Sequence, residues 1–135
     1  MVVPPGEAMI WGLLAAGVPA KNLQALDVDK ERQQKVCGKY KIRPAKDLAG
    51  AMTADAAVIA VKPQQLDRLL SDLAALKSRR PLLLSIVAGA PIKRFRDQLG
   101  ARLKMVRAMP NTPGLIGQGV SAYCAGPGCL SRDVA

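Results

Sequence analysis

The sequence contains no histidine, few aromatic residues and only three cysteines. Without histidine, the chain cannot form a Cys/His zinc site or use a histidine as general base. Cys37, Cys124 and Cys129 are odd in number and lack the spacing of metal ligands, so we interpret them as reduced, ordinary residues. With one Trp, two Tyr and one Phe, the chain is a poor candidate for a surface that stacks nucleic-acid bases.

Long apolar runs are also absent. No stretch reaches the roughly 18 apolar residues that a membrane-spanning helix needs, and the N-terminus shows neither the basic region nor the long apolar core of a signal peptide. Hydrophobic residues still make up 50% of the 135 residues, enough for one globular domain with its own core. We therefore expect a cytoplasmic protein that does not enter a membrane.

Acidic residues are scarce relative to basic ones, with 10 carboxylates against 20 Lys and Arg side chains and a net charge of +10. A charge of this sign suits a nucleic-acid surface or a site for a phosphate-rich cofactor. It is equally the charge of a solvated basic surface without a ligand. Most of the basic residues are spread over residues 21–46, 77–80, 93–96 and 102–107, so composition alone leaves these three explanations open.

The most informative stretch is residues 56–64, Ala-Ala-Val-Ile-Ala-Val-Lys-Pro-Gln. Such a short and uniformly apolar run predicts a strand buried on both faces. Pro63 is typical of a strand end that leads into the first turn of a helix. The leucines that follow have the spacing of one helix face: Leu66, Leu69, Leu70, Leu73 and Leu76. This unit is typical of a parallel α/β sheet, in which ligands bind at the carboxyl ends of the strands, here at Lys62 and Pro63.

Strand and helix patterns alternate along the rest of the chain. We expect helices over residues 6–17, 30–38, 47–52, 66–76 and 91–99, and strands over residues 23–26, 41–43, 56–61, 82–87, 104–108 and 120–124. Gly17 is the expected C-terminal cap of the first helix, and Asp47 is a candidate N-cap. This order is that of half a doubly wound sheet whose start is missing, because Met1–Pro5 are too few for a strand and a turn.

Four sequence blocks occur together. They are residues 6–9 (Gly-Glu-Ala-Met), 60–64 (Ala-Val-Lys-Pro-Gln), 85–89 (Ser-Ile-Val-Ala-Gly) and 109–113 (Met-Pro-Asn-Thr-Pro). In this order and at this spacing they resemble the N-terminal domain of the pyrroline-5-carboxylate reductases. The resemblance runs from about Pro5 to Cys124, and its most specific block is the last.

The resemblance implies a Rossmann-type, doubly wound and mostly parallel sheet that binds NADP or NAD and lacks its first strand. It implies the reduction of 1-pyrroline-5-carboxylate to L-proline by a hydride from the nicotinamide. Residues 1–125 would form the dinucleotide-binding domain, and residues 126–135 a tail leading to a missing C-terminal helical domain. In the family that domain makes the homo-oligomer and much of the substrate site, so we expect this chain to be inactive alone.

At the adenosine end, the resemblance places Pro5 and Gly6 at the end of the dinucleotide-binding loop. The loop's earlier glycines fall on residues 1–3, where this chain has none. Asp27 falls where the family often contacts the adenosine ribose or its 2′-phosphate, and a carboxylate there favours NADH. An exposed Asp at a strand end explains the same residue. Asp47 falls near the adenosine, although a helix N-cap explains it equally well.

At the nicotinamide end, the resemblance implies two facing walls and a turn. One wall is Ala60, Val61, Lys62 and Pro63; the other is Ile86, Val87 and Ala88; the turn beside the nicotinamide and the imine holds Asn111 and Thr112. The apolar members also fit simple core packing. The resemblance assigns no catalytic acid or base and no metal ligand to this chain, because the protein mainly positions cofactor and substrate for hydride transfer.

Two other functions remain open from the sequence. Another imine or β-hydroxyacid reductase shares the fold, although residues 109–113 argue against it. A non-catalytic remnant that binds a partner or nucleic acid through its basic surface is the alternative from a different class. A steep salt dependence of DNA affinity would favour the remnant, and stabilisation by NADH but not by DNA would favour the reductase.

Overall fold

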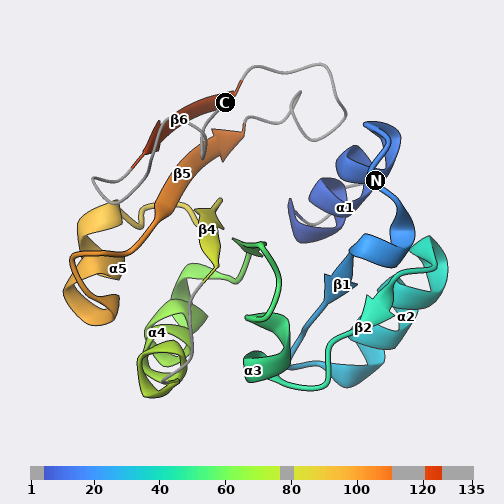
Figure 1. Cartoon of the computed structure of the whole chain (residues 1–135), viewed down its shortest axis with the longest axis horizontal. Helices are drawn as coiled ribbons and strands as arrows, with labels where there is room; N and C mark the ends of the chain where they lie inside the picture. Colours follow the sequence, from blue (N-terminus) through green and yellow to red (C-terminus); the bar gives the residue numbers. More distant parts are fainter. Residues whose placement is uncertain (1–4, 77–80, 111–120, 126–135) are drawn as a thin grey trace.

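The computed structural model describes residues 5–76, 81–110 and 121–125 of the chain (Figure 1). Helices and strands alternate along it, as expected from the sequence. The elements are α1 (Pro5–Ala15), η1 (Ala20–Asn22), β1 (Gln24–Ala25), α2 (Lys30–Tyr40), β2 (Arg43–Pro44), α3 (Leu48–Ala51), β3 (Ala56–Ile59), η2 (Pro63–Gln65), α4 (Leu66–Ala75), β4 (Leu82–Ser85), α5 (Ile92–Leu99), β5 (Met105–Pro110) and β6 (Ser121–Ala125).

The strands form two sheets. In the larger sheet, β3, β4 and β5 are parallel neighbours and β6 adds an antiparallel edge. In the smaller sheet, β1 pairs with β2 in parallel. Figure 1 shows β1 and β2 with α1 and α2 on the right, and β4, β5 and β6 with α4 and α5 on the left. The prediction of an α/β fold with a mostly parallel sheet is therefore confirmed.

The two sheets separate where the first strand of a doubly wound sheet would lie. That strand normally sits between the strands corresponding to β1 and β3. Among the strands of the described ranges, none pairs with the free edge of β1 or of β3. The described topology is thus a doubly wound sheet with this central position unfilled by any described strand, as the sequence led us to expect.

The core lies between the larger sheet and the two helices that follow its parallel strands. The leucines of α4 point inward as their spacing predicts, and α5 adds its own apolar face. The buried cluster includes Ile59, Leu83 and Met105 from the strands, Leu66, Leu70 and Leu73 from α4, and Phe95 and Leu99 from α5. Since α4 and α5 cover one face of the sheet, the core is one-sided at β3 and β4.

Strand β3 differs from its prediction. We expected residues 56–61 to be buried on both faces, but Val58 keeps 39% of its surface exposed and Ala56 is exposed as well. Ile59 points the other way and is only 4% exposed. Successive side chains of a strand point to opposite faces, and α4 and α5 cover only the face of Ile59. The prediction was wrong because a uniformly apolar strand does not reveal whether both of its faces are covered.

The ends of the helices agree with most of the local predictions. Gly17 has a φ of 98° after α1, with Val18 N–H donating to the Leu13 carbonyl, as in a glycine-capped C-terminus. Asp47 caps α3 by accepting from Gly50 N–H at 2.7 Å. Lys41 was predicted to begin a strand, but it ends α2 with a φ of 56° and the strand begins at Arg43. A non-glycine residue in this conformation gives no sequence signal for the helix end.

Candidate functional site

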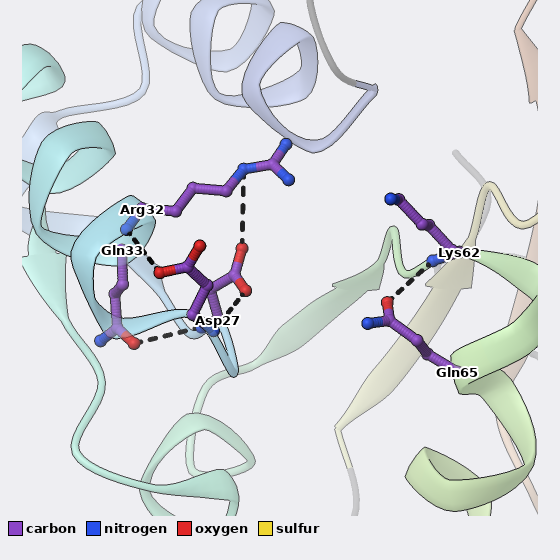
Figure 2. A network of polar contacts seen from close by, with 6 residues as sticks. Asp27, Arg32, Gln33, Lys62 and Gln65 are labelled. Carbon is purple, nitrogen blue, oxygen red and sulfur yellow. Dashed lines mark hydrogen bonds and ion pairs between the residues drawn. The ribbon is translucent and has the colours of Figure 1, made fainter.

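The predicted site residues lie at the carboxyl ends of the parallel strands. Asp27 follows β1, Lys62 follows β3 and Val87 follows β4. Figure 2 shows two groups of side chains: Asp27, Arg32 and Gln33 on one side of the view, and Lys62 and Gln65 on the other. In open α/β sheets, ligands bind at this edge, at the point where the strand order reverses. The structure therefore places the Asp27 and Lys62 segments at the carboxyl ends of their strands, as expected.

The first turn of α1 reaches the same edge. A Cβ atom at Gly6 would lie 3.3 Å from the Cβ atom of Ala60, closer than most contacts of this kind. Gly6 thus lets the start of α1 approach the end of β3. The N–H groups of a first helical turn have no partner within the helix and attract anions. Pro5 begins the helix, a position at which the missing N–H of proline costs little.

Asp27 is held by a hydrogen-bond network. Its Oδ1 accepts from the backbone N–H of Asp29 at 2.9 Å, and its Oδ2 lies 3.8 Å from Nε of Arg32 (Figure 2). Its own backbone N–H donates to Oε1 of Gln33 at 3.1 Å. Asp27 is therefore not just an exposed residue at a strand end, because its carboxylate has a fixed direction and a cation beside it.

Gln33 was missed by the sequence analysis. It lies on α2, is buried, and donates from Nε2 to the carbonyl of Ala45 at 2.9 Å while accepting from Asp27 and from Nζ of Lys30. It thereby ties the end of β1 to the segment after β2. A glutamine within a polar helix gives no sequence signal of burial, since its partners are distant in sequence.

Asp47 has a structural role that accounts for it. Its carboxylate is engaged as the N-cap of α3, on Gly50 N–H. This confirms the N-cap interpretation, whereas contact with an adenosine stays a prediction.

The turn after β3 has the form predicted from Pro63. Lys62 N–H donates to Oε1 of Gln65 at 3.3 Å (Figure 2), and Gln65 N–H donates to the Lys62 carbonyl at 2.9 Å. Pro63 begins the short η2 turn that continues into α4. The Lys62 side chain is exposed, and Ala60 and Val61 are half-buried. This turn leaves a cation and a rigid backbone at the edge of the sheet.

The segment after β4 forms the facing wall. Ile86 N–H donates to the carbonyl of Ile59 at 3.1 Å, which links the two walls, and Val87 N–H donates to Oγ of Ser85 at 3.2 Å. The side chain of Val87 is buried in the core, Ile86 is half-buried and Ala88 is exposed. Packing thus explains the Val87 side chain, while the backbone at Ala88 is free to line a ligand. Asn111 and Thr112 lie outside the described residues.

The side chains at this edge are suited to binding rather than to bond making. They offer the Asp27 carboxylate, the Arg32 and Lys62 cations, and apolar walls. In the ranges that the structure describes, no group of three or more His, Cys, Asp or Glu could hold a metal ion. In those same ranges, no helix has the length and apolar character needed to cross a bilayer.

Comparison with known proteins gives one family. The family described as "NADP oxidoreductase coenzyme F420-dependent" matches residues 5–89. The pyrroline-5-carboxylate reductase of Pseudomonas aeruginosa is 38% identical over 119 residues, 87% of this chain and 44% of that protein. The one from Vibrio alginolyticus is 36% identical over 120 residues, 88% of this chain and 44% of that protein. The chain thus spans somewhat less than half the length of these curated relatives.

Solved structures give the same result. A pyrroline-5-carboxylate reductase from Coxiella burnetii superposes with a TM-score of 0.86 at 25% identity, covering 96% of this chain and 48% of that one. A Plasmodium falciparum pyrroline carboxylate reductase, solved with NADP bound, has a TM-score of 0.80 at 27% identity, covering 99% and 49%. The fold of this chain is therefore the Rossmann-like half found in those structures.

Proposed function

We propose that this chain, which belongs to the family described as "NADP oxidoreductase coenzyme F420-dependent", is the dinucleotide-binding half of a reductase that converts 1-pyrroline-5-carboxylate to L-proline. The observation that carries the proposal is the placement of Gly6 and Lys62 at the carboxyl end of β3, with Asp27 at the carboxyl end of β1. The relatives favour this substrate over other reactions of the family, because those named above are all pyrroline-5-carboxylate reductases.

The residues present fit a dinucleotide. Gly6 lets α1 pack closely on Ala60 at the end of β3, which places the unpaired N–H groups of the first turn of α1 where a phosphate would bind. Asp27 offers a directed carboxylate to ribose hydroxyls, while Arg32 beside it offers a cation to a 2′-phosphate. NADP or NAD is therefore the proposed cofactor. When bound, it supplies the hydride for the imine carbon of the substrate.

The proposed role of this chain in the reaction is positioning. The Ile86–Ile59 hydrogen bond holds the two walls in register, and the Lys62–Gln65 turn fixes the end of the first wall. Walls of this kind keep the nicotinamide in one orientation and exclude water from it. Contact with cofactor or substrate stays a prediction for Ala60, Val61, Pro63, Asn111 and Thr112. A cytoplasmic location, homo-oligomers of the whole enzyme and the end of the dinucleotide-binding domain at residue 125 are also predictions.

Asp27 is expected to control the choice between the two cofactors. Asp27→Asn keeps an oxygen for Asp29 N–H but removes the charge that repels a 2′-phosphate. We expect the ratio of the dissociation constants of NADPH and NADH to shift about tenfold toward NADPH, which corresponds to about 1.4 kcal/mol. Fluorescence titration with both cofactors measures it. Asp55→Asn, the same charge change at the amino end of β3, is the control and should leave the ratio unchanged.

Melting curves test the proposed function itself. NADPH or NADH at millimolar concentration is expected to raise the melting temperature by a few degrees, because a ligand that binds only the folded state stabilises it. Duplex DNA at low salt is tested in the same way, because the alternative function predicts that the chain binds nucleic acid. Stabilisation by DNA and not by either cofactor would instead support the non-catalytic remnant, for which the comparisons give no support.

A further inference from the structure

The side chain of Glu7, in the first turn of α1, forms hydrogen bonds with the C-terminal end of α2. Its Oε1 accepts hydrogen bonds from Nζ of Lys39 and from the hydroxyl of Tyr40, both at 2.8 Å. Lys39 and Tyr40 are the last two residues of α2. The Glu7 side chain is 17% exposed, whereas that of Lys39 is 63% exposed. We call these three residues the Glu7 clamp.

Apolar packing alone does little to fix the orientation of α1 relative to α2. Glu7 is the only charged residue in the sequence of α1, and Ala8 is the only residue of this helix buried below a tenth of its surface among those whose side chains are described. Apolar contacts are not directional, whereas two hydrogen bonds to one carboxylate oxygen require one orientation of the helix. The Glu7 clamp is therefore a directional contact between α1 and α2.

The clamp acts next to the site. Glu7 directly follows Gly6, whose backbone approaches Ala60 at the end of β3. The first turn of α1 is thus held between the end of α2 and the carboxyl end of β3. The hydrogen bonds from Lys39 and Tyr40 lower the pKa of Glu7, and the nearby charges of Lys39 and Arg32 add to this. Glu7 consequently stays ionised near neutral pH, with its charge offset by Lys39 where an anion would approach.

We propose that Glu7 is a positioning residue for the dinucleotide: through Lys39 and Tyr40 it fixes the N–H groups after Gly6 in the place where they meet the cofactor phosphates. Glu7 makes no contact with the cofactor in this role. The inference rests on the proposed function for the identity of the ligand, but it assigns part of the affinity to a contact that does not touch that ligand.

The test compares clamp variants with a matched surface control. Glu7→Gln keeps an acceptor oxygen but removes the charge that strengthens both hydrogen bonds, and it is expected to raise the dissociation constant of NADPH about tenfold. Tyr40→Phe and Lys39→Met each remove one donor and should raise it about threefold to fivefold, whereas Lys39→Arg keeps a donor and should restore most of the affinity. Glu31→Gln breaks the exposed Glu31–Lys35 pair of α2 with the same change in charge and should leave affinity unchanged.

A spectroscopic measurement separates positioning from general destabilisation. In the unaltered chain, NADPH should shift the amide resonances of Gly6 and Lys62. In Glu7→Gln, the shift at Gly6 should be lost while that at Lys62 remains. If Glu7→Gln melts earlier yet binds NADPH as tightly as the unaltered chain, the clamp is only structural and the inference is wrong. If Glu7→Gln does not fold, Tyr40→Phe and Lys39→Met decide in the same way.

The outcomes also separate the two proposals. If NADPH produces no shift in the unaltered chain, the proposed function fails and the inference fails with it. If NADPH binds but no clamp variant weakens it more than Glu31→Gln does, only the inference fails.

Discussion

Replacing Ile59 by aspartate is expected to unfold the domain, whereas the same replacement at Val58 should leave it folded. Ile59 lies in the core cluster with 4% of its surface exposed, and a carboxylate there would have no partner and no water. The cost of an unpaired buried charge is about 3–5 kcal/mol, comparable to the whole stability of a small domain. Val58 is 39% exposed, so its carboxylate can reach solvent at a cost of about 1 kcal/mol.

Urea denaturation followed by circular dichroism measures the free energy of unfolding of these two variants. The two variants differ by one position on the same strand and carry the same new charge, so each is the control for the other. Equal losses of stability in both would show that β3 is covered on both faces. A normal transition in Ile59→Asp would show that the face of α4 and α5 is not the core.

A polypeptide of these 135 residues alone is expected to show no turnover of 1-pyrroline-5-carboxylate above background. The chain spans 44% of the Pseudomonas aeruginosa relative, and the described site offers binding groups rather than groups for bond making. Positioning both reactants contributes about 10⁵-fold or more to rates, and one half of a site cannot supply it. The measurement is NADPH or NADH oxidation with purified, monodisperse protein.

A chimera is the positive control for that absence of turnover. Residues 5–125 would replace the matching stretch of the Pseudomonas aeruginosa reductase, which supplies the rest of that enzyme. We expect this chimera to oxidise NADPH in the presence of the imine. Turnover by the isolated chain at the rate of the chimera would contradict the prediction. A folded chimera that binds NADPH without turnover would instead contradict the substrate proposed for this chain.

Local signals in the sequence were sufficient for much of the fold. The leucine spacing of α4 reports one buried face, because a helix repeats every 3.6 residues whatever it packs against. Pro63 marks the strand end through its own ring, and Asp47 caps α3 through a contact three residues away. These features depend on neighbours in the chain, so the sequence contains all the information that they need.

Features that depend on distant residues could not be predicted in the same way. Val58 and Ile59 look alike in sequence, and only the placement of α4 and α5 distinguishes their faces. Glu7 meets Lys39 and Tyr40 across more than 30 residues of chain, and Gln33 is buried by partners outside its own helix. Nothing in the composition of these helices indicates which polar side chains will meet, since that follows from tertiary packing.

A titration with NADPH, followed by amide correlation spectra of the labelled chain, tests the central claim most directly. It detects binding even at millimolar affinity and shows where the ligand lies. A dinucleotide bound at the carboxyl ends of the strands should shift the amides of Gly6, Asp27, Lys62 and Ala88, while Asp55 at the opposite edge stays unchanged. Two results would contradict it. One is the absence of any shift at an NADPH concentration 5–10 times the roughly millimolar dissociation constant of such a weak site. The other is a set of shifts centred on Lys93 and Arg96 of α5.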